Sequence, residues 1–155
     1  MLPDDPGKFR QDVQSPLKAD ILAYRGDFPM KIKSIDHVVL TTGNLEKCLT
    51  FYAGLLGMEH QEKNGRHALL FGAQKFNIHT RKGEFQPAAE NPSKGSLDIC
   101  LVVEGSIEEI AAEIKAKGQA VELGIVKRTG ALGPIDSIYL RDPDGNLVEL
   151  CVYQK

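Results

Sequence analysis

The chain has 155 residues, of which 42% are hydrophobic and 26% are charged, and its formal net charge is −2. This length suits one domain that is large enough to bury a core. The small net charge gives no electrostatic case for nucleic acid or an anionic membrane surface, and no apolar run approaches the length of a membrane span. We therefore expect neither nucleic acid nor a membrane as a partner.

The first thirty residues differ from the rest of the chain. Residues 1–30 contain four prolines and scattered charges, which predicts an extended or disordered arm ahead of a domain at 31–155. They lack the apolar segment of a targeting sequence, so we expect a cytoplasmic protein. Cys48, Cys100 and Cys151 stand apart within apolar patterns and show no CxxC spacing, which favours reduced, buried thiols.

The domain opens with a predicted strand at 35–42 (IDHVVLTT). A helix then begins at Asn44, carries apolar residues at helical spacing and ends at Gly57. Three strand-like segments follow the helix and are separated by turns that contain glycine: 59–63, 66–71 and 75–80.

A second strand at 97–103 (LDICLVV) begins the same pattern again. Ser106 is a good N-cap for the helix after it, Glu109 completes a capping box, and Gly118 ends the helix. The strands that follow are predicted at three places: 120–127, 137–141 and 147–153. The segment 128–134 (RTGALGP) contains glycines and a proline, which predict a flexible connection.

The two halves of the domain repeat one unit. The helix caps Asn44 and Ser106 are 62 residues apart, and the terminal glycines Gly57 and Gly118 are 61 apart. Two tandem β-α-β-β-β modules, at about 32–82 and 96–155, explain this spacing. We therefore predict an α+β fold in which the two modules form a curved, partly open eight-stranded sheet, a trough with helices on its outer side.

The run Asp142–Leu150 (DPDGNLVEL) predicts a tight turn inside a β-hairpin. In its second strand Glu149 is a carboxylate flanked by apolar residues. A buried carboxylate without a partner is costly, so Glu149 must be solvated, paired with a cation such as Arg141, or bound to a metal.

These motifs together resemble the vicinal oxygen chelate superfamily, the group of glyoxalase I, bleomycin-resistance proteins and extradiol dioxygenases. The resemblance runs from residue 32 to 153 and is carried by three motifs: Ile35–Val39, Phe51–Tyr52 with Leu56–Met58, and Asp142–Asn146 ending at Glu149. It implies a divalent metal (Zn, Ni, Mn or Fe) at the floor of the trough, a small-molecule substrate and a homodimer.

Carried over residue by residue, the resemblance places metal ligands at His37, Asp98 and Glu149. Two positions depart from the glyoxalase I pattern, because Asn77 stands where a glutamate is usual and Asp98 where a histidine is usual. Counting back from the helix caps aligns His37 with Ile99 instead of Asp98, and a slip of one residue reverses every side chain on a strand. We favour Asp98, because one inserted residue near Glu104 reconciles both counts.

The leading functional hypothesis is a metal-dependent enzyme of the lyase or isomerase type that chelates adjacent oxygens of a small molecule. Glu149 and His79 are its candidate catalytic residues. Candidate substrate-binding residues are Asn77, Tyr139 and Arg128, which on a lid would pair with a carboxylate or phosphate.

Two alternatives stay open. One is a non-catalytic small-molecule-binding module of the bleomycin-resistance type, and the other is an extradiol-type dioxygenase that uses His37, His79 and Glu149. His60 and His67 have no partner in this pattern and are interpreted as surface residues.

Overall fold

The computed structural model describes residues 30–154. The predicted N-terminal arm lies outside this range except for its last residue, and residues 30–36 carry no helix or strand. From Ile35 onward the chain forms one compact unit. None of the helices within 30–154 is long and apolar enough to cross a membrane.

The first module contains four strands and one helical segment. Its strands are β1 (His37–Thr41), β2 (Glu59–Lys63), β3 (Arg66–Phe71) and β4 (Gln74–His79). The predicted helix is α2 (Leu45–Leu49) followed directly by a π-helix, η1 (Thr50–Leu55). Asn44 is the N-cap, as predicted, and accepts the backbone N–H of Lys47 at 3.0 Å. At the junction the Thr50 hydroxyl donates to the Glu46 carbonyl, a bond that perturbs regular helix geometry.

The second module repeats this order. Its elements are β5 (Asp98–Val102), α3 (Ile107–Ala116), β6 (Leu123–Gly130), β7 (Gly133–Arg141) and β8 (Leu147–Tyr153). Ser106 caps α3 by accepting the N–H of Glu109 at 3.4 Å. The carboxylate that its hydroxyl reaches is that of Glu108, at 2.7 Å, and this bond lowers the pKa of Glu108. The cap is confirmed, but within residues 30–154 the Ser106 N–H does not donate to the Glu109 carboxylate, so the predicted capping box is incomplete.

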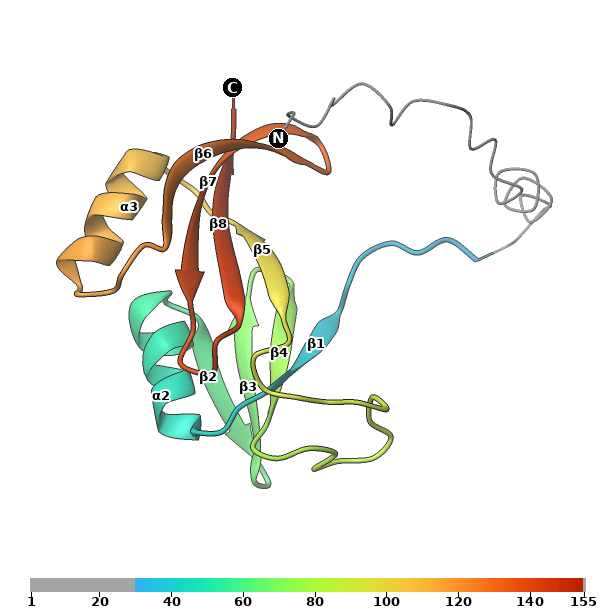
Figure 1. The fold of residues 1–155 in the computed structure, drawn as a ribbon. Helices are drawn as coiled ribbons and strands as arrows, with labels where there is room; N and C mark the ends of the chain where they lie inside the picture. The colour runs from blue at the N-terminus through green and yellow to red at the C-terminus, as the bar shows by residue number, and fades with distance from the viewer. Residues whose placement is uncertain (1–29, 155) are drawn as a thin grey trace, which may run out of the picture. The chain divides into compact units, whose positions relative to one another are not determined.

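The eight strands are divided between two four-stranded sheets, β1-β4-β3-β2 and β5-β8-β7-β6 (Figure 1). In each sheet the first two strands are parallel and the others are antiparallel. Strands β1 and β5 therefore each lie at a sheet edge. The α+β class and the two repeated modules are confirmed.

One face of each sheet packs into a shared hydrophobic core with the helices. Val38, Leu40 and Phe76 enter the core from the first sheet, and Ile99 and Leu150 from the second. Because side chains alternate along a strand, the residues between them lie on the opposite face. We call this second face the open face of each sheet.

The segment 128–134 is part of a hairpin and not a flexible connection. Strands β6 and β7 pair up to Gly130 and Gly133, and Pro134 lies opposite Thr129. Proline is tolerated near the start of a strand, where it costs few ladder hydrogen bonds. The prediction of a lid that carries Arg128 is therefore wrong, and Arg128 is a strand residue.

The turn after β7 holds the two modules together through its acidic side chains. Asp142 is only 5% exposed. Its Oδ1 accepts the N–H groups of Asp144 and Asn146, and its Oδ2 accepts the Asn146 amide and the Tyr52 hydroxyl at 2.9 Å. Since Tyr52 belongs to η1, this buried carboxylate joins the second module to the first.

The same turn contacts the first module at a second place. The Asp144 carboxylate accepts from the Thr42 hydroxyl and from the Gly43 N–H. The Asn146 side chain accepts the N–H of Leu97 at 2.9 Å, just before β5. The DPDGN motif thus fixes β8, which carries Glu149, relative to the end of β1 and the start of β5.

Candidate functional site

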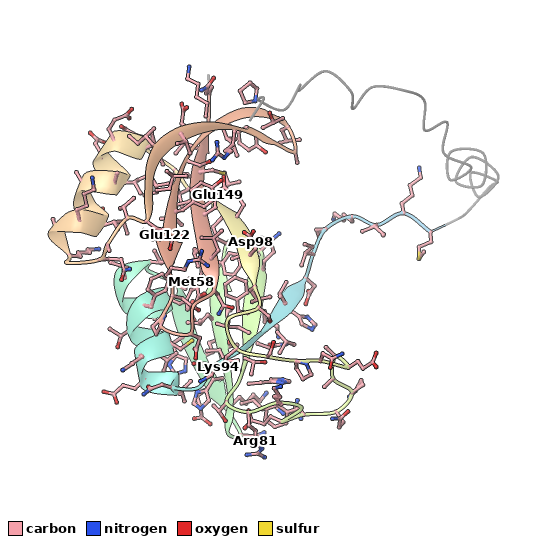
Figure 2. All side chains as sticks on the ribbon, in the orientation of Figure 1. Met58, Arg81, Lys94, Asp98, Glu122 and Glu149 are labelled. Carbon is pink, nitrogen blue, oxygen red and sulfur yellow. The ribbon has the colours of Figure 1, made fainter. Side chains whose placement is uncertain are left out.

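Glu149 lies on β8, on the open face of the second sheet (Figure 2). Its backbone pairs with Cys100 on β5 and with Tyr139 on β7, so these three side chains share that face. Glu149 is half-buried, and its Oε1 is buried without a hydrogen-bond partner among residues 30–154. A buried polar atom without a partner costs free energy, so this oxygen is a place where a water molecule, an ion or another ligand would be stabilised.

Asp98 is the first residue of β5 and lies on the same open face as Cys100 and Glu149. Ile99 points the other way and packs against the core. The favoured register, which aligns Asp98 with His37, is therefore the one that the structure has. The sheet offers two carboxylates, from Asp98 and Glu149, on one face.

Arg141 does not pair with Glu149. Its guanidinium binds Glu122 in a bidentate manner, with Nε and one NH₂ group at 2.7 and 2.9 Å from the two carboxylate oxygens. This bond lowers the pKa of Glu122. The alternative in which Glu149 is the salt-bridge partner of Arg141 is therefore wrong.

Tyr139 stands beside Glu149 and is held by Arg128. The Arg128 Nε donates to the Tyr139 hydroxyl oxygen at 3.1 Å, and the guanidinium lies 5.6 Å from the ring centre. Desolvation raises the pKa of Tyr139 and the nearby Glu149 raises it further, although the bond from Arg128 acts in the other direction. The hydroxyl is thus protonated at neutral pH, and it can still donate its hydrogen.

On the first sheet, His37 begins β1 and lies on the open face. Its Nδ1 is 2.7 Å from the Asp36 carboxylate, and about half of its side chain is exposed. This hydrogen bond is the main cause that lowers the pKa of Asp36. With Nδ1 occupied, Nε2 is the ring nitrogen that remains for a ligand. A carboxylate on the second nitrogen is the usual partner of a metal-binding histidine.

Asn77 and His79 follow on the open face of the same sheet, where they pair with Val39 and Thr41 of β1. His79 is 7% exposed, and its Nδ1 is buried with no hydrogen-bond partner in the described part of the chain. Its ring meets the edge of Phe85, in the loop after β4, at 5.2 Å between centroids. Both residues therefore share a face, as predicted, and His79 is covered by this loop.

The candidate ligands lie in two halves. Asp98 and Glu149 belong to the second sheet, and His37 belongs to the first. Within residues 30–154, no group of three or more His, Cys, Asp or Glu side chains is placed to hold a metal. One copy of the chain thus does not bring His37 together with the two carboxylates.

Two pairs of side chains were not foreseen. Cys100 is exposed, contrary to prediction, and its thiol lies 3.4 Å from the sulfur of the buried Cys151. His60 and His67 also form a pair, with stacked rings and nitrogens 3.1 Å apart. Both contacts join residues on neighbouring strands, and a single sequence does not reveal such a pairing until the strand register is known.

The thiols should differ sharply in reactivity. Burial raises the pKa of Cys48 to about 12, and the acidic residues of the DPDGN turn add to this. The pKa of Cys100 is also raised by desolvation, but this thiol is exposed. Because the thiolate is the reactive form, we expect iodoacetamide at pH 8 to label Cys100 slowly and to leave Cys48 and Cys151 unlabelled until the protein unfolds. Peptide mapping by mass spectrometry that finds Cys48 labelled as fast as Cys100 would contradict this packing.

The chain matches the family model described as Glyoxalase/Bleomycin resistance protein/Dioxygenase superfamily over residues 34–150. The virulence protein STM3117 of Salmonella typhimurium is 45% identical over 125 residues, which cover 80% of this chain and 87% of that protein. The glyoxalase domain-containing protein RDO1 of Mycosarcoma maydis is 46% identical over 125 residues, which cover 81% and 71%.

Solved structures agree with this assignment. The crystal structure of STM3117 superimposes with a TM-score of 0.78 at 44% identity, over 81% of this chain and all of that one. Lactoylglutathione lyase from Agrobacterium tumefaciens gives a TM-score of 0.61 at 22% identity, over 79% of this chain and 95% of that one, and shares the fold. The chain therefore belongs to the Glyoxalase/Bleomycin resistance protein/Dioxygenase superfamily.

Proposed function

We propose that this protein is a metal-dependent enzyme of the lyase or isomerase type, which acts on a small molecule with two adjacent oxygens. The metal would be a divalent ion, Zn, Ni, Mn or Fe, held by His37, Asp98 and Glu149. The observation that carries this proposal is the buried, unpartnered Oε1 of Glu149 on the same open face as Asp98. Imidazole and carboxylate groups are the ligands that such ions take.

The proposed site is completed by a second copy of the chain. His37 and the pair of Asp98 and Glu149 lie on different sheets, so a two-fold related partner would supply the missing half of each site and give two sites per dimer. The surface supports such pairing. Strands β1 and β5 are sheet edges, and Val39 and Val102 on their open faces are 39% and 63% exposed. Edge strands with exposed apolar residues are usually covered in the working assembly.

The bound metal would supply Lewis-acid polarisation of two substrate oxygens. The chain's own residues would orient the substrate and move its protons. Glu149 and His79 are the proposed proton carriers, because each has a buried atom without a partner. Tyr139, held by Arg128, would donate a hydrogen bond to a substrate oxygen. Asn77 would contact the substrate from the first sheet.

A closer relationship is proposed on the sequence alone. The runs Lys75–His79 and Arg128–Asp142 resemble glyoxalase domain-containing protein 5.

The second candidate function is a non-catalytic binding module, and it is favoured by the neutral Asn77 in place of a glutamate. The extradiol alternative takes His37, His79 and Glu149 as ligands, and it leaves unused Asp98, which lies on the same open face as Glu149.

Metal analysis tests the proposed function. Protein treated with EDTA and then titrated with Zn²⁺, Ni²⁺ and Mn²⁺ should bind about one ion per chain, as a site with three protein ligands does. His37→Ala and Asp98→Ala should weaken this binding, since each removes one ligand. Glu122→Gln is the control, because Glu122 is an exposed carboxylate bound to Arg141. Wild-type protein that binds none of these ions at millimolar concentration would favour the binding module.

A further inference from the structure

The first sheet carries a concave surface to which none of the proposed metal ligands contributes. A cleft of about 370 Å³ lies on its open face, beside the β2–β3 hairpin. The charged, polar and aromatic residues of its lining that bear on ligand binding are Lys63, Arg66, Lys75, Asn77, His79 and Phe85. All of them belong to the first module and the loop after it, whereas Asp98 and Glu149 lie on the other sheet.

The cleft is positively charged. Of the described residues that line it, three are cationic and none carries a carboxylate. Lys63 and Arg66 are direct neighbours across the hairpin. Within residues 30–154, none of the three cations is in a salt bridge. The carboxylate of Glu62, on the opposite side of β2 from Lys63, accepts the Gly65 N–H at 2.7 Å. The Asp36 carboxylate lies near Lys75, which helps to lower the pKa of Asp36 after the larger effect of the His37 hydrogen bond. Lys63 and Arg66 are therefore the cations whose mutual repulsion a bound anion would relieve most.

An aromatic wall and two polar groups complete the cleft. The Arg66 guanidinium lies 4.2 Å from the centre of the Phe85 ring, and His79 meets the same ring edge-on. The buried Nδ1 of His79 has no hydrogen-bond partner among the residues that the structure describes. Asn77 adds a side-chain amide that can donate two hydrogen bonds. The cleft thus joins donors and cations to an apolar surface, which suits a ligand with an oxyanion at one end and a carbon skeleton at the other.

We propose that this cleft binds the oxyanion of a small organic ligand, a phosphonate or phosphate ester with two negative charges, while Phe85 packs against its carbon skeleton. Arg66 and Lys63 make the main contacts with the anion, and Lys75 adds long-range attraction. The claim that this anion is the substrate of the protein rests on the proposed function. The binding of the anion itself needs no metal.

The test uses phenylphosphonate as the probe and metal-free protein in EDTA at pH 8 and low salt, measured by isothermal titration calorimetry. Benzenesulfonate, with one charge, and benzamide, with none, are the matched probes. We expect affinity to fall in the order phenylphosphonate, benzenesulfonate, benzamide, and to weaken as salt is added. Equal affinity for phenylphosphonate and benzamide, or no phenylphosphonate binding at millimolar concentration, would overturn the proposal.

Variants locate the binding. Arg66→Gln and Lys63→Gln should each weaken phenylphosphonate binding by about fivefold or more, as the loss of one charge-assisted hydrogen bond predicts. Lys115→Gln is the control, because Lys115 is an exposed lysine on α3 in the other module. This variant should bind phenylphosphonate as tightly as the wild type does. A loss in Lys115→Gln equal to that in Arg66→Gln would show diffuse electrostatic binding and overturn the proposal.

The two proposals can fail separately. Glu149→Leu should weaken metal binding by about 100-fold or more, whereas Arg66→Gln should leave metal binding unchanged, because Arg66 is not a proposed ligand. Retained phenylphosphonate binding by a wild type that takes up no metal would refute the proposed function alone. Metal uptake without phenylphosphonate binding would refute the anion cleft alone.

Discussion

Asp142→Ala should lower the free energy of unfolding by about 3–5 kcal/mol, because it removes a buried carboxylate that accepts four hydrogen bonds and leaves their donors unpaired. For a domain of this size we expect the melting temperature to fall by roughly 10 °C or more. Urea unfolding monitored by circular dichroism measures the change. The effect should be this large because Asp142 joins the turn of the second module to Tyr52 of the first.

Two companion variants test that explanation. Tyr52→Phe removes one of the four donors and should cost about 1–2 kcal/mol, and its cost should largely vanish when Asp142 is already alanine. Asp136→Ala is the matched control, because among residues 30–154 the Asp136 carboxylate accepts one exposed hydrogen bond, from Gln154. This variant should change the free energy of unfolding by less than about 1 kcal/mol. Equal losses in Asp142→Ala and Asp136→Ala would contradict the role assigned to the turn.

Glu149→Leu should act in opposite directions on metal binding and on stability. It removes a proposed ligand, so metal affinity should fall by about 100-fold or more, at least as much as the loss of an outer-shell partner costs. It also removes a buried oxygen without a partner, so the metal-free protein should become more stable by roughly 1 kcal/mol. Metal titration and thermal unfolding in EDTA measure the two effects.

This opposition separates a functional carboxylate from a structural one. If Glu149 served only to stabilise the fold, its substitution would make the protein less stable and would leave metal binding unchanged. A fall in the melting temperature of the metal-free Glu149→Leu protein, with metal uptake unchanged, would therefore contradict the site proposed here.

Much of the fold could be predicted because its signals are local. The caps at Asn44 and Ser106, the glycine ends and the alternation of β8 each depend on residues close together in sequence. Because these local signals occur twice at a spacing of about sixty residues, the two modules could be predicted. The hairpin at 128–134 was missed because its glycines and proline indicate a break, whereas pairing with the neighbouring strand overrides that local preference.

The site was harder to predict because it depends on contacts between distant residues. That Asp98 faces outward could be favoured from the repeat, but the pairing of Arg141 with Glu122 and of Cys100 with Cys151 depends on strand register. The role of Asp142 was missed for the same reason, since Tyr52 lies 90 positions away. Nothing local in the sequence shows that His37 and Glu149 lie on separate sheets.

The most direct test of the central claim mixes two variants that should each have lost tight metal binding. His37→Ala and Glu149→Ala proteins, each stripped of metal, are unfolded together, refolded and titrated with Zn²⁺. If each site joins His37 of one copy to Glu149 of the other, half of the dimers contain both variants, and each of these has one intact site. We therefore predict tight binding of about one ion per four chains in the mixture and none in either variant alone. A mixture that binds no more metal than its two components would contradict a site shared between copies.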